Sequence, residues 1–277
     1  MRIVFTLSLL LLAACQTDSA DYPSEMRDQH DGDVPTATGA TGDADTTGLI
    51  TERVTYATVE GEDITGYLAQ PEILSDSLQP AVIVIQEWWG LNENIEAMAR
   101  KLAAEGYVAL AVDLYGGEVA DTPDGAMALM QTAMSQEAAL TDNLKQAYAF
   151  LTDRGVTSVG TIGWCFGGMW SLRTALALPE EIDGSVIYYG RPVTDADELA
   201  TLQMPILAFF GGADDSIPQE TVAAFETALA EAGVDHEVEV YPGTAHAFAN
   251  PSGQAYDAAA AEDAWARTVA FFDTHLR

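Results

Sequence analysis

The sequence predicts an α/β domain with a mostly parallel central sheet and helices on both faces. Short, wholly apolar runs such as AVIVI at 81–85 are typical of buried central strands. Between such runs lie segments with apolar residues at helical spacing, the first of them with Ile95, Ala99 and Leu102 on one face. This alternation of strand and helix indicates parallel strands that are joined by covering helices.

The same patterns give an order of elements from about residue 50 to the C-terminus. Two strands around a turn at 60–63 come first, and strands alternate with helices after them. Strands are expected at 54–59, 64–68, 81–85, 107–112, 159–163, 185–189, 206–210 and 236–241. Helices are expected around 95–102, 140–151, 169–178, 222–229 and 265–276. About 230 residues without a second linker fit one domain of this kind, which we place at 49–277.

The first fifteen residues, MRIVFTLSLLLLAAC, have the pattern of an export signal. Arg2 precedes an apolar run that is too short to remain as a membrane-spanning helix. The run ends in small residues directly before Cys15, which resembles the signal of bacterial lipoproteins, where this cysteine carries the lipid. We therefore expect 1–15 to be a signal peptide with lipobox and the protein to be anchored in the bacterial cell envelope, at the outer membrane or periplasmic face. The alternative is an ordinary secretory signal with an incidental cysteine.

Residues 16–48 are rich in Asp, Thr, Gly and Ala and contain few large apolar side chains. Such a segment cannot bury enough apolar surface to offset the entropy lost on ordering. We interpret it as a disordered acidic tether between the lipid and the domain, with His30 solvated.

Charge and cysteine content exclude several classes of protein. With 43 acidic and 11 basic residues, the formal charge is −32, so binding of nucleic acid or of an anionic membrane through basic patches is not expected. Two cysteines exclude a disulfide scaffold and a cysteine-rich zinc site. The acidity has two interpretations, an ordinary solvated surface or an adaptation to salt, which screens self-repulsion. We expect a monomer.

The loops at the carboxyl ends of the strands are the place to look for reactive groups. The segment GWCFGG at 163–168 joins a strand to a helix, and a residue on so sharp a turn needs small neighbours, here Gly163 and Gly167. A helix N-terminus favours the thiolate of Cys165, and the N–H of Phe166 would face an oxyanion beside the sulfur. The alternative is a small buried cysteine in a tight turn.

Two later strand ends supply an acid and a base. Asp214 follows a strand and a glycine pair and can orient a histidine; alternatively, Asp214 or Asp215 caps the helix that begins near Pro218. His246 lies after the last strand in a loop with turn residues, where a general base could act; alone, it would be read as a surface histidine. The order Cys165, Asp214, His246, each after a separate strand, is the chain order of α/β-hydrolase triads.

A fourth loop, QEWWGLN at 86–92, follows the strand at 81–85. We expect Glu87 beside the thiol and the N–H of Trp88 as a second oxyanion donor. The alternative is a helix-entry loop with Asn92 as N-cap and the tryptophans covering the core.

Together these segments resemble the dienelactone hydrolase family. The matching segments are 86–92, Asp113-Leu114-Tyr115, 163–168, Tyr188-Tyr189-Gly190, 211–218 and 243–248. The resemblance covers the chain from about residue 50 and implies an α/β-hydrolase fold that hydrolyses esters or lactones without a metal or other cofactor. It implies that Cys165 is the nucleophile, His246 the base, Asp214 its orienting acid and Glu87 an acidic neighbour that tunes the thiol.

One departure from the family bears on the substrate. Its best-known members hold a substrate carboxylate with arginines shortly after the Asp-Leu-Tyr segment and shortly after the histidine, but 116–118 and 249–251 contain none. A dicarboxylate-type dienelactone is therefore disfavoured, and Arg191 is the nearest candidate cation.

A neutral ester or lactone fits the remaining residues better. The aromatic side chains near the predicted site are expected to form an apolar mouth, with substrate contacts from Trp89 and Tyr115 beside Arg191. The aromatic residues of this mouth are Trp88, Trp89, Trp164 and Phe166. Two alternatives stay open, a catalytically silent lipid-anchored binding protein and a thioester or acyl-peptide hydrolase on the same fold.

Overall fold

The computed structural model describes residues 27, 30, 33, 35, 46–73 and 79–277. The signal peptide and lipidation site predicted at 1–15, and most of the tether predicted at 16–48, lie outside these residues. Among the described helices, none combines the length and the apolar character that crossing a bilayer requires.

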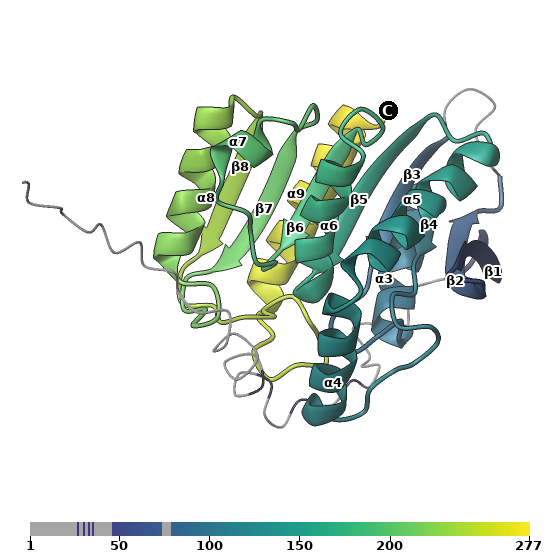
Figure 1. Cartoon of the computed structure of the whole chain (residues 1–277), viewed down its shortest axis with the longest axis horizontal. Coiled ribbons are helices and arrows are strands. Elements are labelled where there is room, and N and C mark those ends of the chain that lie inside the picture. Colours follow the sequence, from purple (N-terminus) through teal and green to yellow (C-terminus); the bar gives the residue numbers. More distant parts are fainter. Residues whose placement is uncertain (1–26, 28–29, 31–32, 34, 36–45, 74–78) are drawn as a thin grey trace, which may run out of the picture.

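An eight-stranded sheet forms the centre of the domain, in the order β1-β2-β4-β3-β5-β6-β7-β8 (Figure 1). The β1–β2 and β2–β4 pairs are antiparallel, and the other neighbours are parallel. The strands are β1 (Leu49–Val59), β2 (Glu62–Pro71), β3 (Pro80–Ile85), β4 (Val108–Ala111), β5 (Ser158–Trp164), β6 (Gly184–Tyr188), β7 (Ile206–Gly211) and β8 (His236–Tyr241). All eight correspond to predicted strands, and the central ones are wholly buried, as their apolar sequences require.

Helices cover both faces of this sheet, and in Figure 1 α6 lies in front of it and α9 behind it. They are α3 (Glu93–Ala104), α4 (Pro123–Met134), α5 (Glu137–Asp153), α6 (Phe166–Ala177), α7 (Ala196–Leu199), α8 (Gln219–Ala232) and α9 (Ala258–His275). The tight packing of α9 needs glycine on β5, since a Cβ at Gly160 would lie 2.7 Å from Phe272. The predicted α/β architecture is confirmed.

Two helices differ from the sequence prediction. The short helix α7 and the longer helix α4 were not predicted. Helix α4 has a start signal that could have been used, because Thr122 accepts a hydrogen bond from the N–H of Gly125 (3.2 Å) and Pro123 is its first residue.

The first residues of α3 and α8 show which of the predicted N-cap residues cap these helices. Asn92 caps α3 by accepting from the N–H of Ile95 (3.3 Å), as one interpretation of that loop required. Pro218 occupies the N-cap position of α8 without a side-chain bond, so the alternative that Asp214 or Asp215 caps this helix is wrong.

Candidate active site

Cys165 stands at a strained turn between β5 and α6. Its φ of 55° is in the left-handed region, and it occupies the N-cap position of α6. Its backbone N–H donates to the carbonyl of Tyr188 on β6 (3.0 Å). A Cβ at Gly163 would lie 2.1 Å from the carbonyl oxygen of Gly167, and a Cβ at Gly167 would lie 2.3 Å from that of Ile85. The turn therefore requires glycine on both sides of the cysteine.

Asp214 and His246 meet at the same edge of the sheet. The Nδ1 of His246 lies 2.7 Å from Oδ2 of Asp214, and both side chains are almost completely buried. The other carboxylate oxygen of Asp214 accepts from the N–H groups of Ser216 (2.9 Å) and Ile217 (3.1 Å), which fixes its orientation. The Sγ of Cys165 lies within 4.8 Å of a ring nitrogen of His246. The structure thus brings the three residues that the sequence singled out into one cluster.

The charges in this cluster shift each other's pKa. Burial alone would raise the pKa of the Cys165 thiol, but the neighbouring imidazoles of His246 and His30 lower it below its ordinary value. Burial would lower the pKa of His246, but the charges of Asp214 and Cys165 raise it. Burial likewise opposes ionisation of Asp214, yet its pKa is lowered by His246 and by two backbone N–H donors. The arrangement favours a thiolate next to an imidazolium.

Glu87 is buried beside this pair, with an exposed fraction of 4 %. Its Oε2 accepts a hydrogen bond from Nδ2 of Asn250 (2.9 Å), a residue to which the sequence assigned no role. Burial, and then the negative charge of Cys165, raise the pKa of Glu87 to about 8. Glu87 is therefore mostly protonated at neutral pH.

The aromatic residues near the sulfur are more deeply buried than an open mouth requires. Trp88 and Trp89 have exposed fractions of 0 % and 1 %, and Phe166 is equally buried. Trp164 faces elsewhere and packs against Tyr188 at a ring distance of 5.4 Å. Other side chains cover the rings of Trp88, Trp89 and Phe166, so the predicted apolar, aromatic mouth is not open to solvent in this structure.

Tyr189, which belongs to one of the segments that resemble the family but had no predicted role, contacts His246. Its φ is 37°, it is fully buried, and its ring centroid lies 5.1 Å from that of His246. It therefore helps to fix the orientation of that imidazole.

His30 is one of the side chains that cover the site, and the prediction that it is solvated is wrong. Its exposed fraction is 2 %, and its ring centroid lies 4.6 Å from Trp88 and 5.7 Å from His246. Its Nδ1 lies 2.7 Å from Oδ2 of Asp33, whose other oxygen accepts from the N–H of Gln254 (2.9 Å). The composition of the segment could not reveal the burial of His30, because no apolar stretch causes it. Two specific polar contacts of Asp33 and the face of Trp88 hold the residue in place. The His-x-x-Asp spacing was the one available signal.

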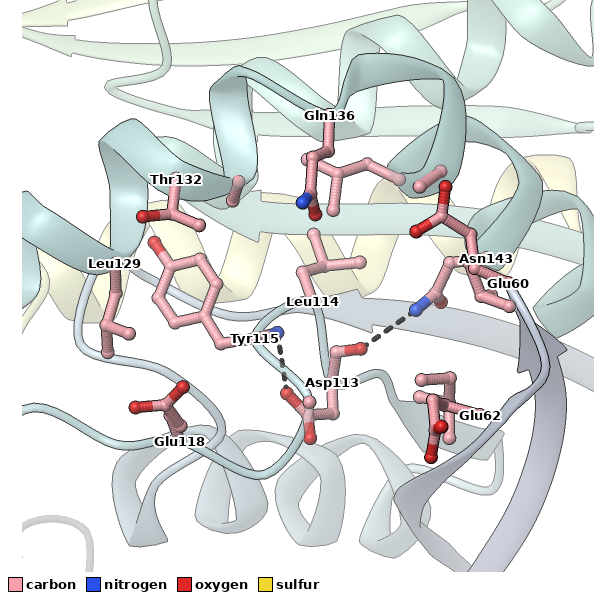
Figure 2. A pocket seen from close by; sticks show the side chains of 16 residues that line it. Glu60, Glu62, Asp113, Leu114, Tyr115, Glu118, Leu129, Thr132, Gln136 and Asn143 are labelled. Atoms are coloured by element: carbon pink, nitrogen blue, oxygen red, sulfur yellow. Dashed lines mark hydrogen bonds between the residues drawn. The ribbon is translucent and has the colours of Figure 1, made fainter.

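A cavity of about 310 Å³ lies between the β1–β2 turn, α4 and α5 (Figure 2). Asp113 holds its floor by accepting from the N–H of Tyr115 (2.8 Å) through its carboxylate and from the Asn143 side chain (2.9 Å) through its carbonyl. The ring of Tyr115 lines the cavity, and its centroid lies 5.5 Å from that of Phe166, the residue after Cys165 in the chain. Arg191, the other predicted substrate contact, lies half-buried in the loop after β6.

The sheet topology, with Cys165, Asp214 and His246 following β5, β7 and β8, is that of an α/β-hydrolase. Residues 64–276 match the model of the dienelactone hydrolase family, and the chain belongs to that family. Its activity is accordingly that of an ester or lactone hydrolase.

Named relatives agree with this assignment. The chain is 37 % identical to "Protein usf" of Aquifex pyrophilus over 224 residues, which cover 78 % of this chain and 95 % of that protein. It is 34 % identical to the "Putative carboxymethylenebutenolidase" of Aquifex aeolicus over 225 residues, covering 78 % and 96 %. Among solved structures, the "Putative Dienelactone Hydrolase" of Klebsiella pneumoniae is 30 % identical, with a TM-score of 0.73 and coverage of 82 % and 99 %.

Proposed function

We propose that the protein hydrolyses a neutral carboxylic ester or lactone through a thioester formed on Cys165. The observation that supports this most is the buried cluster in which the sulfur lies within 4.8 Å of a His246 nitrogen, while Asp214 binds the other nitrogen at 2.7 Å. This is the arrangement that nucleophilic catalysis by a thiol needs, with an activated sulfur, a base and a group that orients the base.

The proposed reaction has two steps. The Cys165 thiolate attacks the carbonyl carbon, and the tetrahedral intermediate collapses to a thioester as the protonated His246 gives its proton to the leaving alcohol oxygen. A water molecule then attacks the thioester carbonyl while His246 takes its proton. The second intermediate releases the carboxylic acid and restores the thiolate–imidazolium pair.

Backbone N–H groups of Phe166 and Trp88 are the proposed donors to the oxyanion. Phe166 is the first residue of α6, so its N–H belongs to the unpaired first turn of the helix. Within the described chain, neither this N–H nor that of Trp88 donates to a backbone carbonyl outside a helix or strand. Two such donors in a site shielded from water would stabilise the developing charge strongly.

The surroundings of the cluster favour a neutral substrate. Residues 116–118 and 249–251 hold no arginine, and Asn250 is bonded to Glu87. The cavity is lined by Glu60, Glu62 and Glu118 as well as by apolar side chains. A second carboxylate on the substrate would be repelled there, whereas a neutral acyl chain would not.

Substrate entry requires a movement, because the exposed fraction of Cys165 is 1 %. The His30 ring packs on Trp88, lies beside His246, and has a nitrogen within 4.8 Å of the Cys165 sulfur. We include in the proposal that His30 moves away before a carbonyl compound reaches Cys165.

Replacing the nucleophile tests this function. We expect Cys165→Ala to lower kcat/KM on small neutral aryl esters by about 10³-fold or more, with Cys165→Ser retaining a small part of the activity. Mass spectrometry of the wild type, quenched during turnover, should find the acyl group on Cys165. A Cys165→Ala protein that melts like the wild type and keeps most of the activity would overturn the proposal.

We also propose that Cys15 carries the lipid that anchors the protein to the cell envelope, which rests on the signal sequence alone. In a bacterial host, the wild type should fractionate with membranes and incorporate labelled fatty acid. Cys15→Ser should do neither, and equal labelling of the two would contradict the proposal.

A further inference from the structure

Three metal-ligating side chains converge in the buried cluster, and the proposed hydrolysis uses two of them. His30, Cys165 and His246 each offer one ligand atom, and the three atoms lie within 4.8 Å of one another. Their exposed fractions are 2 %, 1 % and 2 %. His30 comes from a part of the chain far from the other two and adds a third ligand to the pair.

Both imidazoles are oriented in the same way. Nδ1 of His30 is bonded to Asp33 and Nδ1 of His246 to Asp214, each at 2.7 Å. A carboxylate on Nδ1 keeps a proton there and leaves Nε2 as the atom that can bind a metal, once the metal displaces the proton that an imidazolium carries on Nε2. This is how proteins commonly orient histidines that bind a metal, through a carboxylate behind the ligating ring.

The two Nε2 atoms are buried, and among the described residues neither has a hydrogen-bond partner other than the sulfur of Cys165. A buried polar atom in this state indicates a ligand or a proton that completes it. Two such atoms beside one sulfur form a donor set of two imidazole nitrogens and a thiolate.

This donor set fits a borderline-soft divalent cation. Zinc binds histidine nitrogen and cysteine sulfur at about 2.0–2.3 Å, so its tetrahedral ligands lie about 3.5 Å apart. Ligand atoms already within 4.8 Å reach that spacing by small side-chain rotations. Magnesium and calcium prefer oxygen ligands and would not be held here.

We propose that His30, Cys165 and His246 bind a zinc ion, with water as the fourth ligand, and that the bound ion holds the enzyme inactive. Zinc would take the thiolate lone pair needed for attack and the Nε2 lone pair needed for proton transfer. It would also fix His30 over the sulfur. The inactivation rests on the proposed function, whereas the binding site does not.

Cobalt titration tests the binding directly. The full-length chain carries Cys15→Ser, so that Cys165 is the single thiol, and is freed of metal with a chelator. Co²⁺ should produce a thiolate-to-cobalt charge-transfer band in the near ultraviolet at one equivalent, and Zn²⁺ should remove the band by displacement.

Variants assign the ligands. Cys165→Ser should abolish the band, and His30→Ala should weaken cobalt binding by about 100-fold or more, since it removes a ligand. Asp33→Asn should weaken it by about 10-fold, because it removes the group behind that ligand. The matched control is His275→Ala at the end of α9, which should bind cobalt like the parent.

Activity supplies the second readout. Submicromolar Zn²⁺ should inhibit ester hydrolysis, a chelator should restore it, and Mg²⁺ should have no effect. Absence of the charge-transfer band, or a His30→Ala variant that melts normally and binds cobalt as tightly as the parent, would overturn the site. A band that depends on His30, combined with hydrolysis that does not depend on Cys165, would instead overturn the proposed function and leave the site in place.

Discussion

Two histidines approach the same sulfur, and they reach it by different means. His246 follows β8, the last strand of the sheet, so the sheet itself carries it to the edge where Cys165 lies. His30 precedes the whole domain and is held by Asp33 and the face of Trp88. Each ring is bonded through Nδ1 to a carboxylate at 2.7 Å. Equivalent local geometry can therefore arise from a regular fold or from a few contacts made outside the sheet and its helices.

The largest expected difference between the two histidines is the loss of activity when the carboxylate bonded to each Nδ1 is replaced. Asp214→Asn should lower kcat/KM by about 10⁴-fold, because the amide favours the wrong tautomer of His246. Asp33→Asn, assayed without metal, should change hydrolysis by less than about 10-fold, since His30 takes no part in the proposed steps. Asp215→Asn, at the exposed neighbour, is the control. Similar losses for Asp214→Asn and Asp33→Asn would show that both histidines act in catalysis.

The burial of Glu87 near both histidines makes the stability of the protein depend on pH. Its pKa is raised to about 8, so the folded state keeps a proton that the unfolded chain loses near its ordinary value of 4.5. The stabilisation is complete below the unfolded pKa and disappears as the pH rises to about 8. Between pH 4.5 and pH 9, Glu87→Gln should gain about 4 kcal/mol of unfolding free energy relative to the wild type. Urea unfolding at both pH values measures it, and a difference that is independent of pH would contradict the burial.

The turn that holds Cys165 leaves no room for a side chain at Gly163. Gly163→Ala should lower the unfolding free energy by about 3 kcal/mol, because its Cβ meets the backbone of Gly167 at 2.1 Å. Gly155→Ala is the control: its φ is +87° but nothing lies within 4 Å, so about 1 kcal/mol is expected. Urea unfolding compares the two variants, and equal costs would mean that the turn adjusts more freely than its contacts indicate.

The smallest expected effect concerns how firmly His30 covers the sulfur. His30→Ala should speed alkylation of Cys165 by iodoacetamide about tenfold in metal-free protein, which corresponds to about 1.4 kcal/mol of opening free energy. His236→Ala, on the far end of β8, should leave the rate unchanged. An unchanged rate in His30→Ala would show that another part of the molecule limits access.

The sequence predicted the elements and residues whose signals are periodic or local. Every predicted strand is present, because apolar runs such as 81–85 have no stable place except inside a sheet. Cys165 could be singled out because the glycines around it are required by its own turn. Helix α4 was missed, although its start signal at Thr122 and Pro123 was readable.

Tertiary structure alone decided which polar side chains meet across long separations. Asn250 bonds to Glu87, and the N–H of Gln254 donates to Asp33, through contacts between segments far apart in the chain. Neither contact has a period, a length or a composition that could reveal it. The sequence by itself determined the parallel sheet and the order of nucleophile, acid and base at its edge, since burial of apolar strands and turn geometry act locally. The position of His30 beside the sulfur was decided only by the folded structure. The composition of its segment favours disorder, and a few polar contacts of His30 and Asp33 oppose this tendency.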